Sequence, residues 1–205
     1  MKVQVLEKSD REMKFVLEDS NPQFANALRR IMLGEIPILA VEEVDFSQND
    51  SVLYNEIIAH RLALIPLVFE VDKFHFREEQ HEGEKSCQFC EVVFSISKKA
   101  PGMIYSKDMK SSNPDVKPLF DETPIVELFG EEKLKLEATA RLGYGRHHAK
   151  FQAAIASYKY LDDSGSKFEF YVESVSGMNA EEIVMKSIEV LKQKLKELDK
   201  QIKKI

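Results

Sequence analysis

A regular stripe of apolar residues runs through the last segment of the chain and constrains its fold more than any other feature. Spacings of four and three alternate along the stripe: Val184, Ile188, Leu191, Leu195, Leu198, Ile202 and Ile205. This heptad spacing places apolar side chains along one side of an α-helix. Asn179 and Glu182 form a candidate capping box at its start. The helix packs either on the chain's own core or against another helix, and the length of the stripe favours a partner helix.

A second helix is predicted near the N-terminus. Asn21 is a good N-cap, Pro22 suits the first helical position, and Gly34 marks the end. Its apolar residues fall on one face: Phe24, Ala27, Leu28, Ile31 and Met32. Arg29 and Arg30 lie off this face.

The rest of the chain favours strands. A hairpin is predicted over 2–19, and alternating patterns predict further strands over 38–46, 133–142, 150–160 and 167–174, with one more carrying Val92, Phe94 and Ile96. The turn residues at 162–165 predict a second hairpin from the last two of these strands. A short helix is expected over 52–64, capped by Asn49, Asp50 or Ser51. Prolines interrupt residues 98–124, so we expect an irregular segment there. The pattern as a whole predicts an α+β fold.

The charge balance excludes some functions. The chain carries 29 Lys plus Arg against 35 Asp plus Glu, a net charge of −6, and has no long basic stripe. We therefore expect no direct, specific binding of nucleic acid. The longest apolar stretch, 62–69, is far shorter than the ~20 residues of a membrane-spanning helix. No apolar signal segment opens the chain, so we expect a cytoplasmic protein without a membrane partner.

Cys87 and Cys90 have the spacing with which two thiolates bind one metal ion from a single turn. A closed zinc site needs four ligands, and His75 and His81 are the candidates for the other two. A single Cys-x-x-Cys is a weak signal, and a reduced thiol pair is the alternative interpretation.

Other motifs give little support for catalysis. Gly143 and Gly145 could cradle a phosphate, but the third glycine of a dinucleotide fingerprint is missing, so a tight turn is the preferred interpretation. His147 and His148 would point to opposite faces of a strand. His60 would need an orienting carboxylate to act as an acid or base, and a polar anchor or partner contact is the simpler role. We predict no catalytic residue.

Five segments, in order along the chain, resemble the α-like subunits of RNA polymerase. They are NPQFANALRRIML at 21–33, IPILAVEEV at 36–44, NEIIAHRLALIPL at 55–67, GYGRHHAKF at 143–151 and VESVSG at 172–177. The third segment is closest to the archaeal and eukaryotic branch. The chain is thus similar to the archaeal members of this family, which are counterparts of the N-terminal region of bacterial α.

The resemblance implies a discontinuous dimerisation domain of a sheet plus two helices, from 1–46 and 162–205, with an inserted mostly-β domain over 47–161. It implies a non-catalytic assembly subunit of DNA-dependent RNA polymerase, a nucleotidyltransferase complex. The partners would be the small subunits L, N and P and the large catalytic subunits. Subunit L would contact the two helices, through Phe24, Leu28, Ile31, Met32, Val184, Ile188, Leu191, Leu195, Leu198 and Ile202. The large subunit would contact Asn26, Arg29 and Arg30.

Two departures from the family bear on cofactors. Some archaeal relatives carry a cysteine-rich domain with an iron–sulfur cluster before the last strand, but residues 151–173 contain no cysteine. We therefore expect no cluster. Eukaryotic relatives bind zinc through four cysteines, of which Cys87 and Cys90 resemble only the last two. We favour no bound metal, with zinc as the alternative.

Two hypotheses of other classes stay open. One is a small metal-dependent hydrolase that uses Cys87, Cys90 and a histidine. The other is a homodimer that binds an unrelated protein.

Overall fold

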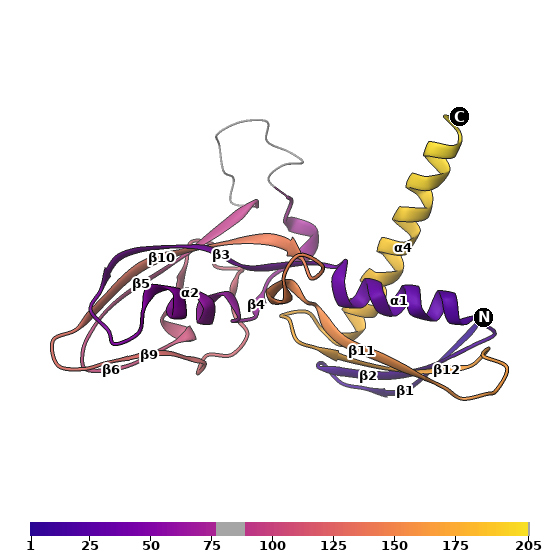
Figure 1. Ribbon diagram of the computed structural model, residues 1–205, viewed down its shortest axis with the longest axis horizontal. Helices are drawn as coiled ribbons and strands as arrows, with labels where there is room; N and C mark the ends of the chain where they lie inside the picture. The colour runs from indigo at the N-terminus through magenta and orange to yellow at the C-terminus, as the bar shows by residue number, and fades with distance from the viewer. Residues whose placement is uncertain (77–88, 205) are drawn as a thin grey trace. The chain divides into compact units, whose positions relative to one another are not determined.

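The computed structural model describes residues 1–76 and 89–204, which form helices and antiparallel sheets (Figure 1). The chain divides into two compact units, Met1–Pro37 with Tyr144–Ile205, and Ile38–Gly143. The predicted α+β class and the discontinuous layout are confirmed. No helix within the described residues has the length and apolar character needed to cross a membrane.

The first unit is built on a four-stranded sheet in the order β1-β2-β12-β11. Its strands are β1 Lys2–Lys8, β2 Glu12–Glu18, β11 Ala154–Tyr160 and β12 Phe168–Ser174. All neighbouring strands are antiparallel, so β1 with β2 and β11 with β12 form the two hairpins that the sequence predicts. β12 pairs with β2, which joins the two ends of the chain in the middle of the sheet.

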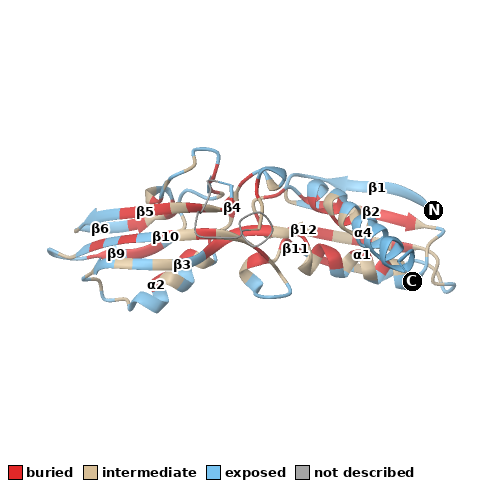
Figure 2. Cartoon of the chain, turned by 90° about the horizontal axis from the view of Figure 1, so that it is seen from above, coloured by how far each residue is buried: buried red, intermediate tan, exposed pale blue. Residues whose placement is uncertain are grey.

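Alternating side chains of β2 and β12 form the core of this unit. Phe170 lies opposite Phe15, and Phe168 lies opposite Leu17. All four side chains are at most 2 % exposed. The rings of Phe15 and Phe170 stack with their centroids 4.9 Å apart. Each phenylalanine buried in this way contributes about 1.5–3 kcal/mol relative to an exposed one. β1 is exposed along its length (Figure 2), so the core ends at β2.

Two helices belong to the same unit: α1 Pro22–Gly34 and α4 Ala180–Ile202. α1 contacts β11 and α4, while α4 contacts β12 and β2. Both predicted N-terminal signals are present. Asn21 Oδ1 accepts a hydrogen bond from Phe24 N at 2.9 Å, and Glu182 Oε2 accepts one from Asn179 N at 3.0 Å.

The carboxyl end of α1 lies against the turn at 145–147. Arg146 N donates a hydrogen bond to Gly34 O at 3.1 Å, which satisfies one of the carbonyls left open at the helix end. Gly145 approaches the helix so closely that a Cβ atom there would lie 2.5 Å from Leu33 O. Gly145 of the Gly-x-Gly motif therefore serves close packing of backbone on backbone in this turn.

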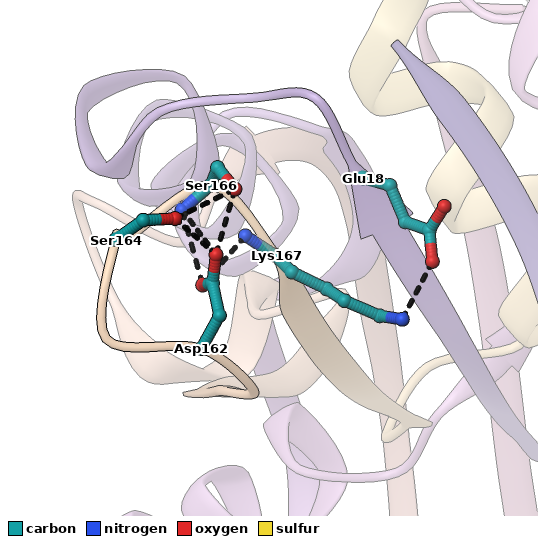
Figure 3. Close-up of polar contacts among 5 residues, drawn as sticks. All are labelled: Glu18, Asp162, Ser164, Ser166 and Lys167. Atoms are coloured by element: carbon teal, nitrogen blue, oxygen red, sulfur yellow. Dashed lines mark hydrogen bonds and ion pairs between the residues drawn. The ribbon is translucent and has the colours of Figure 1, made fainter.

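The loop between β11 and β12 is organised around one carboxylate (Figure 3). Asp162 accepts hydrogen bonds from Ser166 Oγ at 2.7 Å, Lys167 N at 3.0 Å and Ser166 N at 3.1 Å, and also from Ser164 Oγ. Lys167 Nζ forms an ion pair with Glu18 Oε1 at 2.6 Å. Hydrogen bonds to the charged form, first from Ser164 and then from Ser166, lower the pKa of Asp162 from 3.8 to about 2.

The second unit holds a sheet in the order β3-β10-β5-β7 and two two-stranded sheets, β4-β8 and β6-β9. Its longer strands are β3 Pro37–Asn49, β5 Glu91–Lys99, β9 Pro124–Leu128 and β10 Lys133–Tyr144. The shorter ones are β4 Leu67–Val68, β6 Gly102–Tyr105, β7 Lys110–Ser111 and β8 Lys117–Pro118. Single 3-10 turns occur at Val71–Lys73, Ser106–Asp108 and Ala149–Phe151, the last belonging to the first unit.

The predicted strands of this unit are confirmed by their burial. Leu134, Leu136, Ala138 and Ala140 of β10 are at most 1 % exposed, as are their neighbours on β5, Val92, Phe94 and Ile96. Across this sheet Arg141 joins two strands, since its guanidinium donates to Glu43 at 2.9 and 3.1 Å and to Glu91 at 3.2 Å.

The short helix differs from its prediction. α2 spans Asn55–Ala63 and begins after Tyr54, not at 52. Asn49 and Ser51 do not cap it, because their side chains close the preceding loop: Ser51 Oγ donates to Asn49 Oδ1 at 2.6 Å, and Asn49 Nδ2 donates to Leu53 O at 2.9 Å. The segment 98–124, expected to be irregular, also contains the short strands β6, β7 and β8.

The unit boundaries lie apart from those expected at 46/47 and 161/162. The break after Pro37 falls at the start of β3, and the second falls before Tyr144, near the end of β10. Residues 154–160, expected in the inserted domain, pair along β12 and so belong to the sheet of the first unit.

We expect Gly145→Ala to lower the free energy of unfolding by about 1–3 kcal/mol, because the added methyl group overpacks the contact with Leu33. Gly34→Ala is the matched control on the opposite side of the contact. Its Cβ would meet Arg146 N at 3.4 Å, an ordinary contact distance. Chemical denaturation of both variants measures the difference. Equal stability of the two would contradict the close approach.

Asp162→Asn should lower stability at neutral pH and change its pH dependence. The folded-state pKa of Asp162 lies below the unfolded value, so its contribution is present above about pH 4 and is lost as the pH falls toward its folded pKa of about 2. Unfolding measured between pH 7 and pH 2 should therefore show the wild type and the variant converging at low pH. The control is Asp163→Asn, since Asp163 makes no hydrogen bond with the described residues. A constant difference across the range would count against this assignment.

Candidate partner-binding surfaces

The stripe on α4 divides into a covered half and an exposed half. Val184 is 8 % exposed, and Ile188 and Leu191 are half-buried. Beyond them Leu195, Leu198 and Ile202 are 58 %, 56 % and 59 % exposed. Ile205 lies outside the described residues. Figure 1 shows the same division, with the second half of α4 extending away from the sheet of its own unit. This half presents a row of leucine and isoleucine side chains that nothing in the described chain covers.

An ion pair marks the place where α4 leaves its own core. Lys194 Nζ binds Glu35, the residue directly after α1. The fully buried positions of α4 all lie before this point: Ala180, Ile183, Val184 and Ser187. The sequence stripe missed Ile183 because it lies off the heptad spacing.

The apolar face of α1 has a different environment. Leu28, Ile31 and Met32 are at most 5 % exposed, and Phe24 is half-buried. These side chains form part of the chain's own core, where α1 meets β11 and α4. Within this structure, α1 therefore offers little apolar surface of its own.

The polar side of α1 carries the residues expected to contact a large subunit. Asn26 and Arg30 are exposed and Arg29 is half-buried. Arg29 donates a hydrogen bond to Asn26 Oδ1 at 3.4 Å. Arg30 makes no ion pair with the residues that the structure describes.

The turn beside α1 holds two more basic side chains. The Arg146 guanidinium carbon lies 4.9 Å from the centre of the Tyr144 ring. His147 meets the same ring edge-on, with centroids 5.9 Å apart. His148 uses Nδ1 to accept a hydrogen bond from Lys150 N at 3.1 Å. His147 lies in the turn that follows β10, and His148 comes directly after it, so neither is part of the strand.

The candidate metal ligands are only partly described. Cys90 is 2 % exposed, and His75 N donates to Phe89 O at 2.9 Å. Cys87 and His81 lie outside the described residues. Across 1–76 and 89–204, no group of three or more His, Cys, Asp and Glu side chains could hold a metal ion.

α2 places His60 at the surface, and no side-chain hydrogen bond between His60 and Glu56 occurs in the described part of the chain. The neighbouring Arg61 has a structural role, since its guanidinium donates to Ile125 O at 2.7 Å. The segment around α2 also exposes apolar residues that the sequence analysis did not single out: Val52, Tyr54, Ile57 and Leu64. The described surfaces thus offer apolar and basic contacts of the kind used in protein–protein binding.

Comparison with known proteins gives consistent matches. The family model for the RNA polymerase Rpb3/RpoA insert domain matches residues 44–161. The DNA-directed RNA polymerase subunit Rpo3 of Pyrococcus furiosus is 46 % identical over 160 residues, which cover 78 % of this chain and 59 % of that protein. The Rpo3 of Archaeoglobus fulgidus is 41 % identical, over 78 % of this chain and 61 % of its own length.

The match to Rpo3 of Methanosphaera stadtmanae is longer, at 41 % identity over 87 % of this chain and 66 % of that protein. The chain therefore aligns with about three fifths of the length of most of these relatives. The insert-domain match covers more than half of the chain, and the matches to these relatives cover 78–87 % of it. The chain belongs to the Rpb3/RpoA family of RNA polymerase subunits.

Proposed function

We propose that this chain is a non-catalytic assembly subunit of a DNA-dependent RNA polymerase. It pairs with a small α-like subunit, of the kind called L, and the pair carries the small subunits N and P and the large catalytic subunits. It acts in the cytoplasm, where the DNA template is also located. Family membership supports the polymerase assignment, because the matched relatives are polymerase subunits by name.

One observation carries the pairing role: the exposed apolar row on the second half of α4. At about 1.5 Å of rise per residue, this half of the helix is roughly 17 Å long. Leu195, Leu198 and Ile202 occupy one side of it and are all more than half exposed. An apolar row of this regularity matches the a and d positions with which helices pair. The first half of the same stripe is covered by the chain's own core. The exposed row therefore lies in line with side chains that are already packed.

We therefore assign fewer residues to the partner interface than the sequence analysis expected from the two helices. We assign its apolar part to Leu191, Leu195, Leu198 and Ile202 and leave the buried residues of α1 to the core. Phe24, half-buried at the start of α1, is a second contact point. The large-subunit contact falls to the polar side of α1, at Asn26, Arg29 and Arg30.

The polymerase role is tested by purifying the chromosomally tagged chain and identifying every co-purifying protein by mass spectrometry. We expect the two large polymerase subunits and one small α-like subunit in near-equal amounts. Recovery of the chain alone, or as a homodimer by native mass, would contradict the proposal.

Leu195→Asp and Leu198→Asp should each weaken binding of the small α-like subunit at least roughly a hundredfold, because a carboxylate buried in an apolar interface costs several kcal/mol. The matched control is Gln193→Asp, which makes the same change of charge on the opposite side of α4. Gln193 is exposed, and in the described part of the chain its side chain donates a hydrogen bond to Glu197 one turn further along the helix. Isothermal titration with the co-expressed partner gives the affinities. Equal weakening by all three variants would refute the interface assignment.

A further inference from the structure

Two segments that reach the first unit are free of acidic residues, although the chain as a whole is acidic. Aspartate and glutamate account for 35 of 205 residues, yet none lies between Asp19 and Glu35 or between Glu137 and Asp162. The first segment contains α1, and the second contains the turn at 145–147. In Figure 1 this turn, between β10 and β11, lies beside the carboxyl end of α1.

Backbone contacts hold these two segments together. The hydrogen bond from Arg146 N to Gly34 O and the close approach of Gly145 to Leu33 fix the turn against the last turn of the helix. Arg30 precedes Gly34 by four residues and so lies on the same side of α1. The side chains of Arg30 and Arg146 therefore project from adjacent parts of one surface, and both are exposed.

Tyr144 holds the basic side chains of the turn in place. The Arg146 guanidinium lies over the Tyr144 ring at 4.9 Å, and His147 contacts the ring edge-on. Stacking orders the planar guanidinium while its N–H groups, which point outward in the plane, stay able to bind a carboxylate with two hydrogen bonds. Within the described chain, neither Arg30 nor Arg146 makes an ion pair. The acidic residue nearest to Arg30 in the sequence is Glu35, which forms an ion pair with Lys194.

We propose that Arg30, Arg146 and His147 form one receptor for a short acidic segment of a partner protein. The inference rests on the proposed function and extends it, because it places the partner on the large-subunit side of α1 and gives the chemistry of the contact. Arg30 and Arg146 make no ion pair within the described chain. Each guanidinium group can therefore bind one carboxylate through a pair of hydrogen bonds. Tyr144 and Gly145 are positioning residues, since they fix the turn without touching the partner.

The size of the surface favours a polypeptide over nucleic acid. Proteins that hold DNA through its backbone typically neutralise about 6–10 phosphates. The proposed receptor offers two permanent charges and one histidine on a chain with a net charge of −6. A pair of carboxylates from a protein satisfies these groups, which are too few to follow the backbone of a nucleic acid strand.

The test uses the full chain, tagged and expressed in its own cells, in place of the wild type. In Arg146→Glu and Arg30→Glu, recovery of the large polymerase subunits should fall at least tenfold, while recovery of the small α-like subunit stays unchanged and shows that the chain is folded. Arg146→Lys keeps the charge but loses the planar fork, so we expect an intermediate loss that grows with salt. Lys2→Glu, an equal charge reversal on exposed β1, is the matched control.

A photo-cross-linking amino acid at position 147 then identifies the partner segment. A cross-linked peptide of a large subunit with at least two Asp or Glu residues near the attachment point would support the receptor. Cross-links to nucleic acid, or to a segment without acidic residues, would overturn it, as would unchanged recovery of the large subunits with Arg146→Glu. Failure of the wild-type chain to recover any polymerase subunit would contradict the proposed function itself, and the receptor with it.

Discussion

The pairing of β2 with β12 is the contact on which the first unit depends. It joins residues from opposite ends of the chain and brings Phe15 and Phe170 into a stacked pair at the centre of the sheet. Once these strands pair, the hairpin partners β1 and β11 complete the sheet on either side. α1 follows directly from β2, and α4 follows directly from β12. Their placement beside one another is therefore a consequence of this single pairing.

The parts of the fold set by local chemistry could be predicted from the sequence. The start of α1 was predictable because Asn21 reaches an amide only three residues away. The same holds for the capping box at Asn179 and for the hairpin loop around Asp162, whose partners all lie within five residues. The start of α2 was not predictable in this way. Asn49 and Ser51 are cap residues by type, but their hydrogen bonds close a loop instead.

The candidate surfaces needed the structure, because a periodic apolar pattern does not show what covers it. Leu28 and Leu198 both belong to helical stripes, yet one is 4 % exposed and the other 56 %. The difference arises because α1 lies wholly on the sheet, whereas α4 continues past it. The role of Gly145 was hidden for a related reason. Its contact with Leu33 spans more than a hundred residues of sequence, and the motif alone predicted only a turn.

The split layout of the first unit has a consequence for the order of synthesis. On a ribosome, residues 38–143 emerge as one continuous stretch and can form their own core while the chain is still growing. The N-terminal hairpin and α1 must wait, because their main partner, β12, is made more than a hundred residues later. α4 is made later still, after β12. A nascent chain interrupted before β12 would therefore lack both the completed sheet and the apolar row on α4.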